Sequence, residues 1–140
     1  MVAAMEVPQD KTSSYGILDV EQQFGNKLPV RGMVEKPAPG TEPSNLAVIG
    51  RYILSPSVLR NLSQIKAGSG GEIQLTDAIA QEITEGRPVN GLRFDGQRFD
   101  CGSKAGFLQA TISFALARSD LGDELFDYMN GVVAMDKAAQ

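Results

Sequence analysis

Apolar positions along the chain fall into stretches that are typical of strands, separated by clusters of turn residues. Short runs of 4–8 apolar or alternating residues bounded by Gly, Pro, Asn or Ser predict strands. The three-residue segment Gly25-Asn26-Lys27 between two such runs predicts a β-hairpin. Polar residues 9–14 and the Pro- and Gly-containing residues 38–44 are expected to be loops. The predicted strands cover residues 1–7, 17–24, 28–35, 46–54 and 88–94, with a short extended piece at 98–101.

Four other stretches have the spacing of amphipathic helices, and they cover residues 56–65, 72–85, 103–117 and 119–134. Gly86 stands where a helix C-cap belongs, and Ser103 stands at an N-cap position. The stretch 103–117 is apolar on two sides, which is typical of a helix buried between layers or against another subunit. Strands that alternate with helices predict an α/β fold with a mixed sheet and flanking helices, and 140 residues fit one domain.

Composition excludes several kinds of function. The net charge of −4 and the pI near 4.8 argue against a nucleic-acid-binding module, which needs a basic surface. The absence of histidine excludes a Ser-His or Cys-His nucleophile and a His-based zinc site within this sequence. The single cysteine, Cys101, excludes an internal disulfide and fits a reducing cytoplasm. No apolar run approaches the roughly 20 residues of a membrane span, so we expect a cytoplasmic protein.

Glu35-Lys36-Pro37 follows the apolar run that ends at Val34. A proline gives no N–H to a sheet, so the strand is expected to end here with a carboxylate and an ammonium side by side. Since successive side chains of a strand alternate, the two are expected to project to opposite faces. Such a pair can accept hydrogen bonds from ligand hydroxyls and neutralise a phosphate. A solvated Glu-Lys pair before a turn is the alternative.

Five segments of the chain, taken in order, form a recognisable series: Tyr15 to Asp19, Val34 to Pro37, Ser44 to Tyr52, Gly71 to Asp77 and Phe99 to Lys104. In this order they resemble the second half of the sugar nucleotidyltransferases, and within them the bacterial UTP–glucose-1-phosphate uridylyltransferases, or UDP-glucose pyrophosphorylases. The resemblance runs from about residue 2 to about residue 130, and the order of the segments makes it specific. The sequence Asp100-Cys101-Gly102-Ser103-Lys104 resembles the uridylyltransferases more than their relatives.

One part of the family pattern has no match. The family opens with a Gly-x-Gly-Thr-Arg loop that binds the nucleotide triphosphate. The glycine cluster Gly68-Ser69-Gly70-Gly71 has no basic residue and is followed by Glu72, so it predicts a flexible turn and not a phosphate loop. Residues 1–140 are therefore expected to be the C-terminal, sugar-phosphate-binding and oligomerisation portion of a nucleotidyltransferase domain, without its nucleotide-binding half.

The resemblance implies roles for individual residues on the sugar side. Glu35 would accept hydrogen bonds from glucose hydroxyls, and Lys36 would contact the phosphate shared by substrate and product. Gly16 would let the backbone approach the sugar, because only a residue without Cβ allows that closeness. Asn45 and the backbone at Val48 would form the wall of the sugar pocket. On the residues alone, Gly16 could equally be a turn glycine and Val48 part of a core strand.

Asp100 matches the family position that, with a second Asp from the missing half, holds Mg²⁺. Taken alone, an Asp before Cys-Gly is more often a turn or cap residue. In the implied reaction, a phosphate oxygen of glucose 1-phosphate attacks the α-phosphorus of UTP, and pyrophosphate leaves. Such catalysis consists of alignment and charge stabilisation, for which Lys36 and Asp100 would be the catalytic residues, and it needs no nucleophilic side chain.

The expected function is formation of UDP-glucose and pyrophosphate from UTP and glucose 1-phosphate, with this chain supplying the sugar-phosphate side of the site and Mg²⁺ as cofactor. Two alternatives remain: another sugar-1-phosphate nucleotidyltransferase of the thymidylyl type, and a non-catalytic sugar-phosphate-binding or dimerisation module. A homo-oligomer is expected, with no nucleic-acid or membrane partner. The 140 residues alone are expected to be inactive.

Overall fold

The computed structural model describes residues 1–21, 25–65 and 72–138. The chain divides into two compact units, Met1–Asp95 and Gly96–Gln140. The glycine cluster at 68–71, for which a flexible turn was predicted, lies outside the described residues.

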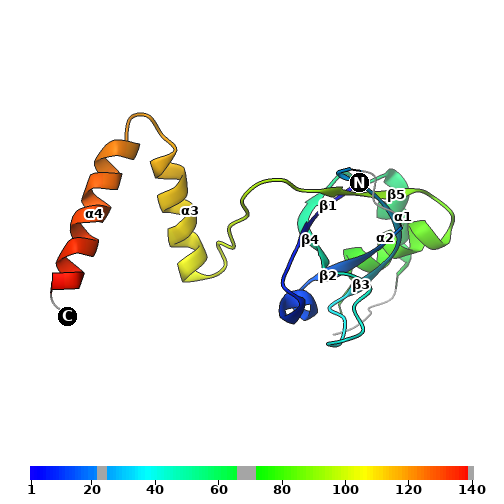
Figure 1. Ribbon diagram of the computed structural model, residues 1–140. Coiled ribbons are helices and arrows are strands. Elements are labelled where there is room, and N and C mark those ends of the chain that lie inside the picture. The colour runs from blue at the N-terminus through cyan, green and yellow to red at the C-terminus, as the bar shows by residue number, and fades with distance from the viewer. Residues whose placement is uncertain (22–24, 66–71, 139–140) are drawn as a thin grey trace. The chain divides into compact units, whose positions relative to one another are not determined.

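The first unit is built on a closed barrel of five strands in the order β1-β4-β2-β3-β5 (Figure 1). The barrel contains both parallel and antiparallel neighbours: β1 pairs in parallel with β5, and the other pairs are antiparallel. This confirms the predicted mixed sheet, although its closure was not predicted. The strands are β1 (Val2–Glu6), β2 (Gly16–Val20), β3 (Lys27–Glu35), β4 (Leu46–Tyr52) and β5 (Val89–Arg93).

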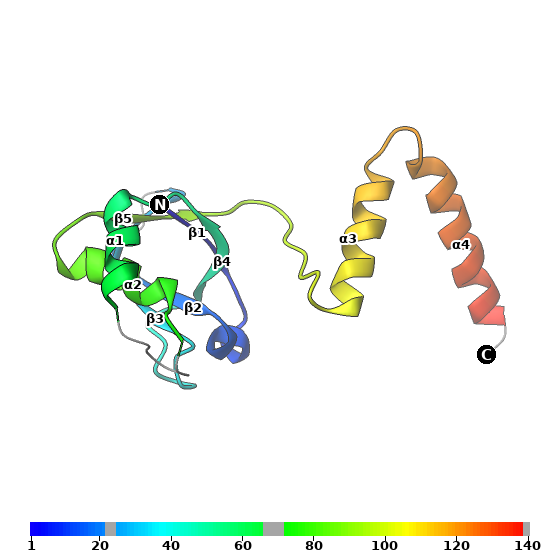
Figure 2. The ribbon, with the colours of Figure 1, turned by 180° about the vertical axis from the view of Figure 1, so that it is seen from behind.

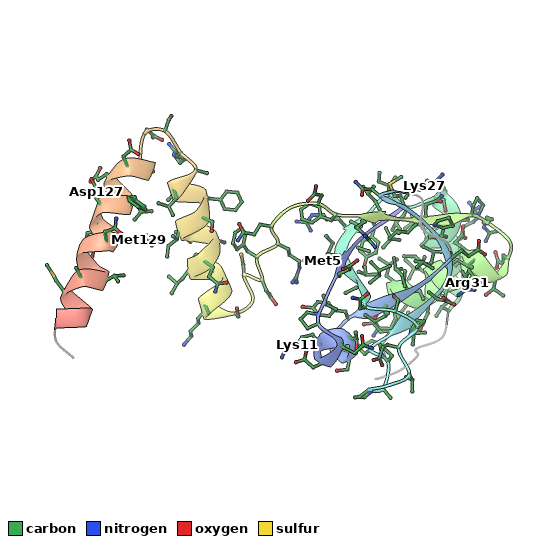
Figure 3. The ribbon with its side chains drawn as sticks, in the orientation of Figure 1. Met5, Lys11, Lys27, Arg31, Asp127 and Met129 are labelled. Carbon is green, nitrogen blue, oxygen red and sulfur yellow. The ribbon has the colours of Figure 1, made fainter. Side chains whose placement is uncertain are left out.

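Inward-facing side chains of these strands form the core, together with side chains of two helices. Alternation along the strands places apolar residues inside and leaves cations such as Lys27 and Arg31 of β3 at the outside of the unit (Figure 3). Gly91 of β5 faces the interior, where an added Cβ would lie 3.0 Å from Leu18 Cδ1. The largest fully buried apolar side chains are Val2, Ile17, Leu18, Leu28, Leu46 and Ile79.

Helices α1 (Pro56–Gln64) and α2 (Leu75–Thr84) cover one side of the barrel, where α2 packs on β3 and α1 packs on α2 (Figure 2). Pro56 occupies the first turn of α1, where its missing N–H is not needed. Gly86 has a φ of +77° and caps α2 as predicted, since a left-handed residue there costs glycine nothing. Helix α2 begins three residues later than the predicted start at residue 72.

Three local predictions differ from the structure. Residues 9–14 form a 3₁₀ helix, η1 (Gln9–Ser14), because Thr12 is buried and its hydroxyl donates to the Gln9 carbonyl at 2.8 Å. The hairpin is confirmed, but β2 ends at Val20, and residues 22–24 of its predicted continuation lie outside the described residues. Residues 98–101 form no strand, because the chain turns there to start a helix.

The second unit is a helical hairpin of α3 (Lys104–Leu116) and α4 (Gly122–Ala138), which pack on one another. The predicted N-cap is confirmed, since the Ser103 hydroxyl accepts a hydrogen bond from the Gly106 N–H at 3.0 Å. Gly106 is required here because a Cβ would lie 2.1 Å from the Asp100 carbonyl oxygen. Among the described residues, no helix is both long enough and apolar enough to cross a bilayer.

Candidate functional site

Two of the predicted site residues, Gly16 and Glu35, face each other across neighbouring strands. Gly16 is the first residue of β2 and Glu35 the last of β3, and the antiparallel register pairs them directly. Just beyond this pair, the Lys36 N–H donates to the Tyr15 carbonyl at 3.0 Å. The ladder therefore brings the Tyr-Gly and Glu-Lys-Pro segments together, although they lie about 20 residues apart in the sequence.

The space in front of the Gly16 Cα is occupied by two side chains. A Cβ on Gly16 would lie 2.9 Å from Oε2 of Glu35 and 2.9 Å from Cγ2 of Thr76, both closer than real Cβ contacts allow. Gly16 is buried and Glu35 is half-buried. The lack of a side chain at Gly16 is therefore what lets these two side chains come so close to the strand, while the predicted approach of a sugar to this backbone stays a prediction. In this structure the groups that approach it are the Glu35 carboxylate and the Thr76 methyl.

Lys36 adopts a left-handed backbone conformation, with a φ of +45°, which is uncommon for a residue with a side chain. It lies just outside β3, so the alternation of a strand does not extend to it, and the prediction that Glu35 and Lys36 alternate across one strand is wrong for this reason. Its side chain is exposed, whereas Pro37 is buried and anchors the turn. A strained residue held between a paired strand and a buried proline is typical of functional sites.

Asn45 directly precedes β4, and Val48 is the third residue of that strand. Val48 is buried, and its Cγ2 would lie 3.8 Å from a Cβ on Gly16. Asn45 is half-buried, and its carbonyl accepts from the Val7 N–H at 3.0 Å. The neighbouring Ser44 hydroxyl donates to the Leu18 carbonyl at 2.6 Å and so ties the entry of β4 to β2.

Thr76 was not singled out as a site residue from the sequence. It lies in the first turn of α2 and is only 6% exposed, yet its hydroxyl oxygen has no hydrogen-bond partner among the described residues. The sequence did contain an indication that Thr76 belongs to the site, because Thr76 lies in the Gly71 to Asp77 segment that resembles the sugar nucleotidyltransferases. Helical periodicity alone gave no reason to treat it as more than a helix residue.

Tyr52, at the end of β4, interacts electrostatically with Glu35. Burial raises the pKa of the Tyr52 hydroxyl, and the nearby negative charge of Glu35 raises it further. The phenol therefore stays protonated at neutral pH and remains a hydrogen-bond donor. In the first unit, the residues around Gly16 thus include a carboxylate, a lysine, the buried hydroxyl of Thr76 and the half-buried phenol of Tyr52.

Asp100 lies in the second unit, whereas Glu35 and Lys36 lie in the first. Its Oδ1 accepts from the Gly102 N–H at 3.1 Å, and its carbonyl accepts from the Ser103 hydroxyl at 3.1 Å. Oδ2 lies 4.0 Å from a guanidinium nitrogen of Arg98. Asp100 therefore shapes the turn before α3, and its exposed carboxylate keeps an oxygen directed to solvent.

A hard divalent cation needs several oxygen ligands. Across the described ranges, no three His, Cys, Asp or Glu residues lie close enough together to hold a metal ion. The exposed Asp100 carboxylate fits one place in such a ligand set by its chemistry, because a carboxylate oxygen is a preferred ligand for Mg²⁺. Within the described residues, Asp100 is thus a candidate for one ligand, and no complete metal site is formed.

A second polar cluster lies away from this group and joins α1 to α2. Glu82 is 3% exposed, and its carboxylate accepts from Ser57 Oγ at 2.7 Å and from Asn61 Nδ2 at 2.9 Å. Arg87 donates to both oxygens, at 2.7 and 2.8 Å. Hydrogen bonds from Arg87, above all, lower the pKa of Glu82 from 4.5 to about 2. Every oxygen is satisfied, so the cluster is structural.

Comparison with known proteins identifies the family. A model of the nucleotidyl transferase family matches residues 1–115. The chain is 41% identical over 133 residues to UTP–glucose-1-phosphate uridylyltransferase of Bacillus subtilis. This match covers 95% of this chain and 45% of the relative. It is 52% identical over 104 residues to the enzyme of the same name from Komagataeibacter xylinus, covering 74% and 36%.

A solved structure of UDP-glucose pyrophosphorylase complexed with UDP-glucose matches with a TM-score of 0.76 and 39% identity, over 84% of this chain and 44% of that one. The chain thus spans less than half the length of the relatives it matches. The resemblance predicted from five sequence segments is confirmed, and the chain belongs to the nucleotidyl transferase family.

Proposed function

We propose that this chain supplies the sugar-phosphate side of the active site of a UTP–glucose-1-phosphate uridylyltransferase, which forms UDP-glucose and pyrophosphate from UTP and glucose 1-phosphate. The observation that carries the proposal is the direct pairing of Gly16 with Glu35, next to the left-handed Lys36. That pairing gathers a hydroxyl acceptor and a phosphate-binding cation at one end of a two-stranded ladder. The names of the relatives favour uridylyl over thymidylyl transfer.

In this proposal, Glu35 accepts hydrogen bonds from glucose hydroxyls, and Lys36 neutralises the phosphate that substrate and product share. Asn45 and Val48 form the wall of the sugar pocket, and the Gly16 backbone borders it. The chemical work is alignment of the phosphate oxygen for in-line attack on the α-phosphorus of UTP. Lys36, as a compact point charge, stabilises negative charge on the phosphoryl oxygens as it develops.

Enzymes of this kind generally use a divalent cation, and we propose Mg²⁺ with Asp100 as one of its ligands. Bound there, the cation would act as a Lewis acid and offset the negative charge of the phosphoryl groups. Asp100 is suited to this because its turn is fixed by Gly102 and Ser103 while its carboxylate is exposed. The remaining ligands would come from residues outside this chain and from the substrates. We further propose that the enzyme acts in the cytoplasm, which suits its exposed free thiol, Cys101.

The proposed function is tested in the complete enzyme that contains this segment. Lys36→Ala should lower the turnover of UTP and glucose 1-phosphate by roughly 10²–10³, as expected for the loss of one charge-stabilising group. Lys36→Arg should restore little, because a planar guanidinium does not fit the place of an ammonium. Steady-state pyrophosphate release, with both substrates saturating, measures the effect.

Lys27→Ala is the matched control, because Lys27 is also an exposed lysine of this hairpin but lies at the other end of β3. It should leave turnover unchanged. Near-normal turnover of Lys36→Ala would contradict the role of Lys36. Turnover of another sugar 1-phosphate or of dTTP, with none of UTP and glucose 1-phosphate, would instead favour the thymidylyl-type alternative.

We also propose that the chain forms a homo-oligomer through its second unit. Apolar side chains on both α3 and α4 are exposed, and contiguous exposed apolar surface is typical of protein interfaces. A second copy of the chain offers the same apolar surface and so can cover it. The exposed apolar residues are Phe107, Leu108, Phe114, Leu116, Leu121, Phe126, Tyr128, Val132, Val133 and Met135.

A further inference from the structure

The unpartnered hydroxyl of Thr76 needs an explanation. Buried polar side-chain atoms nearly always have a hydrogen-bond partner, and one without a partner loses its hydration with no compensation. Thr76 is 6% exposed, and its Oγ1 is closed to solvent without a partner among the described residues. A valine of the same shape would fill this place without that loss. The hydroxyl therefore lowers the stability of the folded state, unless it forms a hydrogen bond in another rotamer of Thr76.

Glu35 is the charged group that Thr76 approaches across Gly16. Cγ2 of Thr76 and Oε2 of Glu35 both lie 2.9 Å from the point where a Gly16 Cβ would be. The Thr76 side chain thus turns its methyl, and not its hydroxyl, toward the space in front of Gly16 that the Glu35 carboxylate also borders. Threonine in a helix has two accessible χ1 rotamers, and a rotation from one staggered rotamer to the next can move the hydroxyl into the place of the methyl.

We propose that Thr76 is a positioning residue for Glu35: its side chain turns about χ1, its hydroxyl donates to the Glu35 carboxylate, and this bond fixes the carboxylate for a hydroxyl-bearing ligand. Hydrogen bonds from a hydroxyl to a carboxylate are short and stronger than neutral ones. The bond removes the unpartnered hydroxyl and holds Glu35 over the Gly16 backbone. The inference rests on the proposed function, in which Glu35 binds the sugar of glucose 1-phosphate.

The kinetic test uses the complete enzyme. Thr76→Val should lower kcat/KM for glucose 1-phosphate by about tenfold to a hundredfold, the range expected for one hydrogen bond to a charged group, and leave KM for UTP unchanged. Thr76→Ser should restore most of the activity. In a Glu35→Gln background, Thr76→Val should add little, because the two residues act as one unit. Equal losses in both backgrounds, or no loss in either, would overturn the proposal.

Stability separates positioning from a structural role. Thr76→Val should unfold at the same temperature as the wild type or a higher one, since a buried hydroxyl without a partner is replaced by a methyl. Thr84→Val is the control in the same helix, because Thr84 is exposed and its hydroxyl donates to the Ala80 carbonyl. It should leave kinetics unchanged. A fall in unfolding temperature of Thr76→Val that accounts for its loss of activity would overturn the proposal.

A measurement without turnover distinguishes this inference from the proposed function. Three-bond NMR couplings of the Thr76 methyl carbon report its χ1 rotamer. In the wild type with glucose 1-phosphate they should show the rotamer with the hydroxyl toward Glu35, and in Glu35→Ala they should show the other. The same rotamer in both overturns the role of Thr76. An enzyme that releases no pyrophosphate from UTP and glucose 1-phosphate overturns the proposed function, while the couplings still decide on Thr76.

Discussion

At the first position of β2, the lack of a side chain decides how close the Glu35 carboxylate and Thr76 can come to the strand. Gly16 is buried, and both neighbours already lie where a Cβ would be. Its backbone φ is not in the left-handed region, so the glycine is needed for space and not for backbone conformation. That distinction makes its substitution informative.

Gly16→Ala should destabilise the protein by about 1–3 kcal/mol, the usual cost of overpacking, and should displace the Glu35 carboxylate. Thermal unfolding and kcat/KM for glucose 1-phosphate in the complete enzyme measure the two effects. Gly32→Ala in β3 is the control, because its added Cβ would make only an ordinary contact of 3.7 Å with Asp19. Equal behaviour of the two variants would contradict a spatial role for Gly16.

Asp100→Asn should keep the fold but raise the Mg²⁺ concentration needed for activity and depress turnover. The amide oxygen can still accept from the Gly102 N–H, so the turn before α3 should persist. Amide oxygens are weaker ligands than carboxylates for a hard cation. A magnesium titration of the complete enzyme, with circular dichroism as the folding control, measures the change. An unaltered magnesium dependence would leave Asp100 as a turn residue only.

At the scale of elements, α1 and α2 are joined by the Glu82 cluster. The folded-state pKa of Glu82 is about 2, below its ordinary value of 4.5, so the ionised form favours the folded state. Its contribution is fully present above about pH 4.5 and is lost as the pH falls toward 2. The cluster therefore makes the helix pair sensitive to acid.

Glu82→Gln should lower the unfolding temperature at neutral pH and reduce the loss of stability between about pH 4.5 and pH 2. Glu85→Gln is the matched control, because Glu85 also pairs with Arg87 but is exposed. Exposed pairs contribute little, so this variant should behave like the wild type. Thermal unfolding followed at several pH values checks both. A wild-type acid profile in Glu82→Gln would show that other carboxylates set it.

At the scale of the molecule, the helical hairpin of α3 and α4 carries most of the exposed large apolar side chains. Leu108→Glu and Tyr128→Glu together should shift the protein to monomers, because charges cannot be buried unpaired at an interface. Leu59→Glu on α1 is the control, since Leu59 and Leu108 are both 59% exposed. Light scattering of the complete enzyme at dilute concentration measures the mass. A monomeric wild type would contradict self-association.

The sequence by itself determined the elements and the motif at the centre of the proposed site. Hydrophobic periodicity and caps such as Gly86 and Ser103 act within a few residues, so they can be seen without the fold. The same holds for Glu35-Lys36-Pro37, whose residue types predict a carboxylate and a cation at a strand end. Boundaries were less well predicted, because features such as the burial of Thr12 depend on how its segment packs against the rest of the unit.

Only the tertiary structure decided which distant residues meet. The register of β2 on β3 places Gly16 opposite Glu35, and the packing of α2 on β3 brings Thr76 over the same glycine. Closure of the barrel depends on the pairing of β1 with β4 and β5, which no local pattern encodes. Periodicity shows which face of an element is buried, but not what it is buried against. The Thr76 hydroxyl could therefore be recognised only once its surroundings were known.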